Sequence, residues 1–337
     1  MNSRPKADVL VTVRFFDDAA VARLQGRGHR VVRADIPYDG IDTHITPAVE
    51  KALETAQAWI IGAAPVTRQL LARHPQLRVL ARRGVGFDTV DVQAVRTLGR
   101  LLTNTPGGNE PAVADHAIAL MLAVGKRVVE AHARMRSGDW RIAIGTELYR
   151  KTVGLVGLGR IGRHVAKRLA GFEARVLAFD PYLDADAAQA AGVIRCSLEE
   201  VLTQSDYLSL HAPLTEQTRH IVSEGALKLM KRDAILVNTA RGELVDEQAL
   251  LAALRENRLA GAGLDVFACE QEPHMRDGAD QLLALPNVVA TPHAAASSRE
   301  SLRRANEAAA DCVAAALEGL PVPQHCIVAD GRPPLHH

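Results

Sequence analysis

The stretch Thr152-Val-Gly-Leu-Val-Gly-Leu-Gly-Arg-Ile-Gly162 predicts a buried strand that turns directly into a helix. Its glycines follow the spacing Gly157-x-Gly159-x-x-Gly162. The first glycine suits a tight turn, the second lets the backbone approach a pyrophosphate, and the third lets the helix pack closely on the strand. The N-terminus of the helix offers free N–H groups and the positive end of its dipole to phosphate. The stretch therefore predicts a dinucleotide-binding turn.

A helix and a second strand follow this turn, and the strand ends in an acid. Arg160 to Ala170 has the apolar spacing of a helix, and Ala174 to Asp180 reads as the strand. A carboxylate at the end of that strand can accept hydrogen bonds from the ribose hydroxyls of adenosine. The alternative is that Asp180 only forms a turn ahead of Pro181. Because a carboxylate also repels a 2′-phosphate, the sequence favours NAD over NADP.

Length and composition limit the classes of function. The 337 residues suit two domains of ordinary size, and the net charge of +1 creates no general attraction for nucleic acid or for an anionic membrane. We expect small molecules and further copies of the chain as partners. The cysteines lack any metal-ligand spacing, which predicts reduced thiols, no metal site and a cytoplasmic location; they are Cys196, Cys269, Cys312 and Cys326.

The chain opens with a smaller α/β region ahead of the glycine turn. Strands are expected at Val9 to Val13, His29 to Arg33, Ala58 to Ile61 and Val79 to Leu80, and helices at Ala19 to Arg27 and Thr67 to Arg73. Two glycine-bearing stretches, Arg83 to Asp88 and Thr103 to Asn109, are expected to be loops, the second leading into the next domain.

The segment from Asn109 to Met135 is rich in Ala, Leu, Met and Val, and its apolar residues go nearly all the way round a helix. Such a helix must be buried on most of its faces. Because it precedes the dinucleotide unit, we expect it to form the interface of a homodimer. An internal core helix is the alternative.

Strands and helices continue to alternate after Asp180, which predicts a parallel sheet covered on both faces. The strands are expected at Tyr207 to His211, Ile235 to Asn238, Gly263 to Val266 and Val288 to Thr291. Ligands of such sheets collect at the carboxyl ends of the strands. A final helix, Ser297 to about Leu317, is expected to return to the first domain.

The chain contains six motifs, which are Asn104-Thr-Pro-Gly-Gly-Asn109, Gly157 to Gly162, His211-Ala-Pro-Leu-Thr215, Asn238-Thr-Ala-Arg-Gly242, Leu264-Asp-Val-Phe267 and Thr291-Pro-His293. In this order they resemble the motifs of the D-isomer-specific 2-hydroxyacid dehydrogenases, a family that includes D-lactate and D-3-phosphoglycerate dehydrogenases and glyoxylate/hydroxypyruvate reductases. The resemblance covers nearly the whole chain. It implies two doubly wound parallel-sheet domains, a Rossmann NAD-binding domain at 106–296 inserted in a flavodoxin-like substrate domain at 1–105 and 297–337.

The resemblance also implies an oxidoreductase that moves a hydride between NAD and C2 of a small D-2-hydroxy acid or 2-keto acid. Arg241 would bind the substrate carboxylate, since a guanidinium holds a carboxylate in a bidentate fork. His293 would be the acid/base, because imidazole titrates near neutral pH. The alternatives are a surface ion pair for Arg241 and a structural role for His293.

An acidic residue is expected to orient His293 and to favour its protonated form. The family usually has a glutamate followed directly by proline, whereas this chain reads Glu270-Gln271-Glu272-Pro273. If the distance along the chain from Asp265 determines the partner of His293, the partner is Glu270. If adjacency to Pro273 determines it, the partner is Glu272. We favour Glu270, because distance from the strand end determines where the side chain lies.

The remaining binding residues are also implied by the resemblance. Asp265 would hold the nicotinamide carboxamide, and the backbone of Gly84, Val85 and Gly86 would receive the substrate carboxylate, with domain closure completing the site. The other expected cofactor contacts are Gly157, Gly159, Arg160, Ile161, Gly162, Asp180, His211, Ala212, Pro213, Thr218, Thr239, Ala240 and His293.

The sequence leaves two alternatives to a small-acid dehydrogenase. Phosphoglycerate dehydrogenases usually carry an arginine in the loop that corresponds to Ile61 to Pro65, and this chain has no cation there. We therefore favour an unphosphorylated acid such as glyoxylate or hydroxypyruvate over 3-phosphoglycerate. The other alternative is an NAD(H)-sensing assembly module that resembles the C-terminal-binding-protein corepressors, which keep the same types of catalytic residue.

Overall fold

The computed structural model describes residues 6–34 and 45–333, which divide into two compact units. Unit 1 is built from both chain ends, Met1–Asn109 and Ser298–His337, and unit 2 is Glu110–Ser297. The boundaries expected from the sequence, after residues 105 and 296, lie four residues and one residue earlier than those of the structure. The expected substrate domain also includes residues 1–5, 35–44 and 334–337, which lie outside the described residues.

Unit 1 contains a six-stranded sheet with the order β13-β5-β4-β3-β1-β2. Five neighbouring strands are parallel and follow the flavodoxin-like order, and β13 pairs with β5 antiparallel at one edge. The strands are β1 (Asp8–Val11), β2 (Arg30–Arg33), β3 (Ala58–Ile61), β4 (Val79–Arg82), β5 (Leu101–Thr103) and β13 (Ile327–Asp330). The sequence had not predicted β5 or β13.

The strands of this sheet are buried on both faces, because helices cover both faces. In β3, Ile60 faces a core formed with α1 and α13, and Trp59 faces a second core formed with α2, α3 and α4. This alternation is the period-2 geometry of a strand. The helices are α1 (Asp18–Gly26), α2 (Pro47–Leu53), α3 (Arg68–Arg73), α4 (Val92–Thr97) and α13 (Arg299–Leu317).

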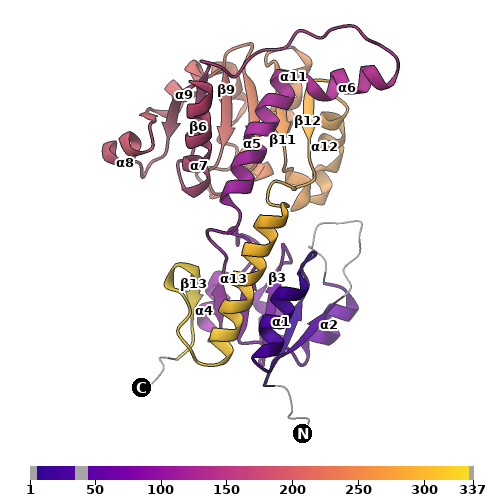
Figure 1. Ribbon diagram of the computed structural model, residues 1–337, viewed down its shortest axis with the longest axis vertical. Coiled ribbons are helices and arrows are strands. Elements are labelled where there is room, and N and C mark those ends of the chain that lie inside the picture. Colours follow the sequence, from indigo (N-terminus) through magenta and orange to yellow (C-terminus); the bar gives the residue numbers. More distant parts are fainter. Residues whose placement is uncertain (1–5, 35–44, 334–337) are drawn as a thin grey trace. The chain divides into compact units, whose positions relative to one another are not determined.

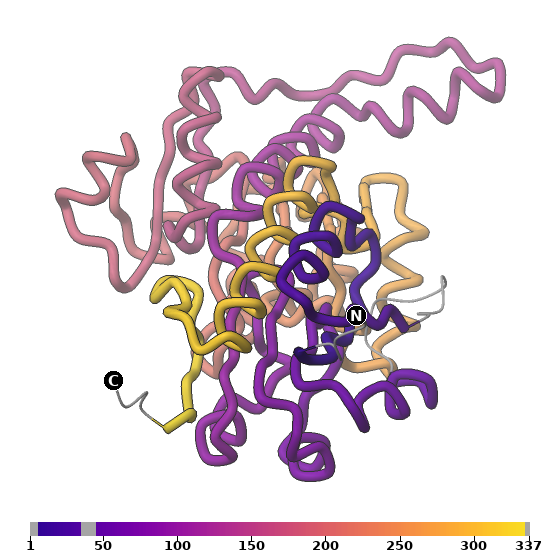
Figure 2. Tube along the Cα trace, turned by 60° about the horizontal axis from the view of Figure 1, so that its bottom comes forward, coloured from indigo at the N-terminus to yellow at the C-terminus, as the bar shows by residue number. Residues whose placement is uncertain are grey.

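The helix α13 brings the end of the chain back to unit 1, as the sequence predicted. It begins after Ser298, whose side chain accepts a hydrogen bond from Ser301 N. Figures 1 and 2 show it in yellow beside the indigo α1. Asn306, completely buried on α13, donates from Nδ2 to Phe15 O at 2.9 Å and to Asp17 Oδ2 at 2.7 Å. These hydrogen bonds tie the two chain ends together.

Unit 2 contains a seven-stranded sheet with the order β12-β11-β10-β9-β6-β7-β8, in which all strands are parallel. This is the Rossmann order, and the strand order reverses between β6 and β9. The strands are β6 (Thr152–Val156), β7 (Arg175–Phe179), β8 (Ile194–Arg195), β9 (Tyr207–Leu210), β10 (Ile235–Asn238), β11 (Gly261–Leu264) and β12 (Val288–Ala290). A ligand site is expected at the reversal.

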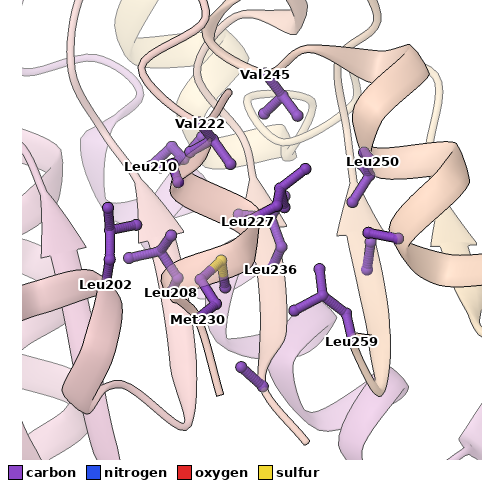
Figure 3. Close-up of a cluster of buried hydrophobic side chains, with 14 of the residues drawn as sticks. Leu202, Leu208, Leu210, Val222, Leu227, Met230, Leu236, Val245, Leu250 and Leu259 are labelled. Atoms are coloured by element: carbon purple, nitrogen blue, oxygen red, sulfur yellow. The ribbon is translucent and has the colours of Figure 1, made fainter. Parts of the chain in front are cut away.

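Each face of this sheet has its own apolar core. Figure 3 shows one core, in which Leu208 of β9 and Leu236 of β10 pack with Leu227 and Leu250 from the covering helices. The core on the other face involves α5 (Glu110–Gly125), α7 and α8. Besides α5, the helices described in the unit are α6 (Val128–Arg136), α7 (Arg160–Leu169), α8 (Ala185–Ala190), α9 (Leu198–Gln204), α10 (Glu224–Leu229), α11 (Glu247–Arg255) and α12 (Arg276–Leu283).

The expectation of one helix from Asn109 to Met135 was wrong, because the segment forms two helices. Arg127 has a φ of 54°, a left-handed conformation that ends α5 before α6 begins. The helix α5 packs on α7 and on β10, β11 and β12 of its own unit (Figure 1). This burial explains why its apolar residues go round the helix. In contrast, α6 has no buried residue.

Candidate active site

The glycine turn brings the ends of β6 and β9 together at the reversal of the strand order. Gly157 has a φ of +96°, and a Cβ atom there would lie 2.7 Å from Ala212 N. A Cβ atom at Gly162 would overlap Gly157 O. Both positions therefore require glycine, for the reasons the sequence spacing suggested.

The N-terminus of α7 is open where a phosphate is expected. Gly159 is the N-cap residue, no side chain caps the helix, and a Cβ atom at Gly159 would meet nothing within 4 Å. Arg160 and Ile161 occupy the first turn, whose N–H groups have no partner within the helix. These features fit the pyrophosphate of a dinucleotide.

Asp180 lies beside the same turn. Its Oδ2 accepts a hydrogen bond from Leu158 N at 2.9 Å, and its Oδ1 accepts one from Tyr182 N at 2.9 Å. The carboxylate is therefore fixed at the end of β7, next to the glycine turn. This is the position from which an acid can meet the ribose hydroxyls of NAD.

The loop after β9 holds further residues that were expected to contact the cofactor. His211 Nε2 lies 3.0 Å from Ser209 Oγ, and burial lowers the pKa of His211 to about 4. The ring is therefore neutral at pH 7. Thr218 Oγ1 donates to Pro213 O at 2.7 Å, which closes the loop on itself. This segment lies directly across the strand reversal from the glycine turn.

The loop after β10 carries Arg241. Asn238, 1% exposed at the end of the strand, accepts a hydrogen bond from Ala240 N at 3.0 Å and donates to Arg241 O at 2.8 Å. Thr239 Oγ1 is buried and has no hydrogen-bond partner among the described residues, so a polar ligand atom could satisfy it. The side-chain amide of Asn238 thus fixes the backbone that presents Arg241.

The structure pairs His293 with Glu270. His293 Nδ1 lies 2.7 Å from Glu270 Oε2, and Glu270 Oε1 accepts a hydrogen bond from Phe267 N at 2.9 Å. Glu272 instead forms an ion pair with Arg219 at 3.1 Å. Distance from the strand end, and not adjacency to proline, therefore identified the partner. The pair leaves His293 Nε2 as the ring atom that can exchange a proton with a substrate.

The turn that carries Glu270 packs directly against the loop that carries Arg241. A Cβ atom at Gly242 would overlap Ala268 N and Phe267 C, so the residue after Arg241 must be glycine. Glu247, 5% exposed on α11, accepts a hydrogen bond from Ala268 N at 2.7 Å. Burial raises the pKa of Glu247, and the nearby Glu243 and Glu270 raise it further.

Asp265 has a role that the sequence did not suggest. Its side chain is completely buried, and its Oδ1 and Oδ2 accept hydrogen bonds from Ala294 N at 2.8 Å and Ala295 N at 2.9 Å. Burial alone would raise the pKa of Asp265, but the hydrogen bonds lower it below its ordinary value. The strand β11 ends at Leu264, two residues before the expected end, so Asp265 follows the strand. It anchors the loop that carries His293.

Gly84, Val85 and Gly86 form a loop after β4 of unit 1. Gly84 has a φ of +136°, its N–H donates to Thr105 Oγ1 at 2.9 Å, and Asn104 Nδ2 donates to Val85 O at 2.9 Å. Asn104 and Thr105 therefore fix the backbone of this loop. The sequence had marked both residues only as part of a motif.

Within residues 6–34 and 45–333, no group of three or more His, Cys, Asp and Glu side chains is arranged to hold a metal ion. No helix in the described part of the chain is long and apolar enough to cross a membrane.

Comparisons with known proteins agree with this geometry. Residues 118–295 match the family model of the D-isomer specific 2-hydroxyacid dehydrogenase NAD binding domain. A glyoxylate reductase of Korarchaeum cryptofilum is 44% identical over 80% of this chain and 82% of its own length. A D-3-phosphoglycerate dehydrogenase of Mycobacterium leprae is 41% identical over 83% of this chain, but this chain covers only 53% of it.

Among solved structures, D-lactate dehydrogenase from Aquifex aeolicus, complexed with NAD and lactic acid, is similar with a TM-score of 0.82. It is 28% identical, and the match covers 97% of this chain and 100% of that one. The family model, the relatives and the fold all agree with the motifs of the sequence. The chain therefore belongs to the D-isomer-specific 2-hydroxyacid dehydrogenases and is an NAD-dependent oxidoreductase of 2-hydroxy acids.

Proposed function

We propose that Arg241, Glu270 and His293 carry out the reaction of this NAD-dependent enzyme. The observation that carries the proposal is the hydrogen bond between His293 Nδ1 and Glu270 Oε2 at 2.7 Å. A carboxylate in this position fixes the orientation of the ring and stabilises the imidazolium when His293 holds a second proton. The half-buried His293 then has one ring nitrogen, Nε2, available for the substrate.

Each residue has a defined task in the reduction of a 2-keto acid. Arg241 binds the substrate carboxylate in a bidentate fork and polarises the carbonyl. Bound NADH supplies the hydride that reduces C2. His293 Nε2 donates the proton that the carbonyl oxygen gains, and in the oxidation of the hydroxy acid it takes the same proton back. Glu270 accepts the hydrogen bond from His293 Nδ1 and keeps the imidazole oriented.

The cofactor-binding residues are proposed on the basis of their places around the reversal of the strand order. Gly157, Gly159 and the first turn of α7 would receive the pyrophosphate, and Asp180 would receive the adenosine ribose. The other proposed contacts lie on the loops after β9, β10 and β12; they are His211, Ala212, Pro213, Thr218, Thr239, Ala240 and His293. Asp265 is buried behind this edge, so a contact with the nicotinamide carboxamide would need its side chain to become accessible.

For the substrate we propose a small unphosphorylated 2-keto acid such as glyoxylate or hydroxypyruvate. The N–H groups of Val85 and Gly86 would bind its carboxylate, and the N–H of Gly84, which donates to Thr105 Oγ1, would hold the loop in place. The loop from Ile61 to Pro65 offers no cation to a phosphate. The similarity to a glyoxylate reductase over most of both chains supports this choice. The similarity to D-3-phosphoglycerate dehydrogenase favours 3-phosphoglycerate as the second candidate, although the chain spans about half the length of that relative.

The test is the oxidation of NADH at 340 nm with a panel of 2-keto acids, comparing glyoxylate, hydroxypyruvate, pyruvate and 3-phosphohydroxypyruvate. We expect turnover with NADH, a preference for the unphosphorylated acids and a lower rate with NADPH. A higher kcat/KM for 3-phosphohydroxypyruvate would overturn the substrate proposal. Tight NADH binding without turnover of any acid would favour the NAD(H)-sensing alternative instead.

We further propose that the enzyme is a cytoplasmic homodimer. The Asn109 to Met135 segment would contribute to the dimer mainly through α6, because α5 buries most of its residues in its own unit. The extended segment after α6 exposes 78% of Trp140, 91% of Ile142 and 88% of Ile144, which a second copy could cover. Sedimentation is expected to give a dimer at micromolar concentration, and a monomer would contradict the proposal. The free thiols fit a reducing compartment.

A further inference from the structure

A second histidine, His116, reaches toward the loop of His293 from the helix α5. Its Nε2 lies 2.8 Å from Thr291 Oγ1 and 3.5 Å from Asp265 Oδ1. The ring is mostly buried, with 22% of the side chain exposed. Neither His116 nor the side chain of Thr291 has a task in the reaction proposed above.

The directions of the hydrogen bonds follow from counting donors. Thr291 Oγ1 lies 2.5 Å from Asp265 Oδ1. An ionised carboxylate only accepts, so the single hydroxyl proton of Thr291 points to Asp265. The lone pairs of Thr291 Oγ1 must then face His116, and His116 Nε2 must carry a proton and donate it. The result is a directed chain from His116 through Thr291 to Asp265.

This chain ends on the carboxylate that holds the loop of His293. Asp265 accepts from Ala294 N and Ala295 N, and His293 N donates to Asp265 O at 2.8 Å. His293 itself has a φ of 51°, in the left-handed region that a residue with a side chain rarely adopts. Such a conformation persists only where the surroundings fix it. Hydrogen bonds on both sides of His293 supply that restraint.

We propose that His116 is a positioning residue for His293, acting through Thr291 and Asp265. The N–H of His116 fixes the hydroxyl of Thr291, and the Thr291 hydroxyl fixes one oxygen of the carboxylate to which Ala294 and Ala295 are bound. Loss of this N–H lets the 291–295 loop move and takes His293 away from the position that Glu270 defines. This inference rests on the proposed role of His293, but the network itself can be tested without any turnover.

Two substitutions of His116 separate the N–H from the rest of the side chain. The Nε2 of glutamine stands the same number of bonds from Cα as the Nε2 of histidine, so His116→Gln keeps a donor in place. The Nδ2 of asparagine corresponds to Nδ1 instead, so His116→Asn cannot reach Thr291. Ala119→Asn, at an exposed position of the same helix, controls for the lower helix propensity of asparagine.

The first measurement is amide hydrogen exchange of the 290–297 segment in the full-length protein without cofactor. We expect exchange about fivefold faster in His116→Asn, as for the loss of one hydrogen bond, and near the wild-type rate in His116→Gln and Ala119→Asn. Equal protection of the segment in His116→Asn and wild type would overturn the proposal, whether or not the protein reduces any keto acid.

The second measurement is steady-state reduction with NADH and the best keto acid of the panel. We expect kcat to fall about tenfold in His116→Asn with KM nearly unchanged, and His116→Gln to restore most of it. A purely structural role would lower the melting temperature of His116→Asn without this selective loss of kcat. An unchanged kcat in His116→Asn, in an enzyme where His293→Asn is inactive, would overturn the inference and leave the proposed function intact.

A second pair of variants tests the same chain if His116→Asn fails to fold. Thr291→Val removes the hydroxyl but keeps the shape of the side chain, and Thr291→Ser restores the hydroxyl. We expect Thr291→Val to reproduce the faster exchange and the lower kcat, and Thr291→Ser to reverse both. Wild-type behaviour of Thr291→Val in both measurements would contradict the proposal.

Discussion

Two loops at the carboxyl edge of the unit 2 sheet carry Arg241 and His293, the side chains proposed to react, and different groups hold the two loops. The neutral amide of Asn238 holds the loop of Arg241 through hydrogen bonds of 3.0 Å and 2.8 Å. The ionised carboxylate of Asp265 holds the loop of His293. The neutral amide places no negative charge where Arg241 must attract an anion. The pH dependence of stability and activity should therefore be concentrated in the His293 loop and in the residues that hold it.

The largest predicted effect concerns the Arg241 loop. Arg241→Gln should raise the KM for the keto acid about hundredfold, because the charge-assisted hydrogen bonds to the substrate carboxylate are lost. Steady-state kinetics with NADH at saturation measure this change. Arg219→Gln removes another partly exposed arginine, which pairs with Glu272, and should leave KM unchanged. An unchanged KM in Arg241→Gln would show that the guanidinium does not bind the substrate.

The second prediction concerns the charge that holds the His293 loop. Asp265→Asn should lower the free energy of unfolding at pH 7 by about 2 kcal/mol, because an amide cannot accept all the hydrogen bonds that the carboxylate accepts. The folded pKa of Asp265 is lowered, so its contribution is present above the ordinary value of 3.8 and is lost as the pH falls through the folded pKa.

Urea unfolding between pH 3 and pH 7 measures this contribution. The difference in stability between wild type and Asp265→Asn should be largest at pH 7 and should shrink toward pH 3. A difference that is the same at every pH would mean that the charge of Asp265 is irrelevant to its role.

The smallest predicted effect is a gain in the free energy of unfolding at high pH, whereas Asp265→Asn should cause a loss. The folded pKa of Glu247 is raised, so the folded state becomes less stable as the pH rises above the ordinary value of 4.5. Glu247→Gln cannot ionise and can still accept the hydrogen bond from Ala268 N. We expect the variant to equal wild type in stability near pH 4 and to exceed it by about 1 kcal/mol at pH 8. A variant that is less stable than wild type at pH 8 would contradict this account.

The sequence predicted the fold well where periodicity and glycine chemistry act locally. The glycine turn, α7 and the parallel strands of unit 2 other than β8 follow from patterns within about thirty residues, as a βαβ unit requires. Three strands were missed. The strand β8 has only two residues, β5 runs into the glycine-bearing stretch Thr103 to Asn109, and β13 is an antiparallel edge strand that follows the last helix, outside the alternation of strands and helices. The break at Arg127 was missed because a left-handed conformation at a non-glycine residue leaves no mark in the sequence.

For the site as well, the sequence predicted the residues that local patterns place and missed the contacts that only packing brings about. Arg241, Glu270 and His293 stand at strand ends or a fixed distance beyond them, so the sequence could place them. His116, Thr291 and Asp265 come together because α5 packs on β11 and β12 in one particular register. That register is set by core packing, which spacing along the chain does not reveal. The network that holds the His293 loop therefore became visible only in the structure.

The proposal that the Arg241 loop binds the substrate and the His293 loop transfers the proton is tested most directly by stopped-flow measurement of a single turnover of bound NADH. The rate of NADH oxidation is followed while the keto acid is varied, in wild type and in His293→Asn. We predict that His293→Asn lowers the rate at saturation and leaves the half-saturating concentration of keto acid near the wild-type value. A wild-type rate at saturation in His293→Asn would contradict the assignment of His293 as the proton donor.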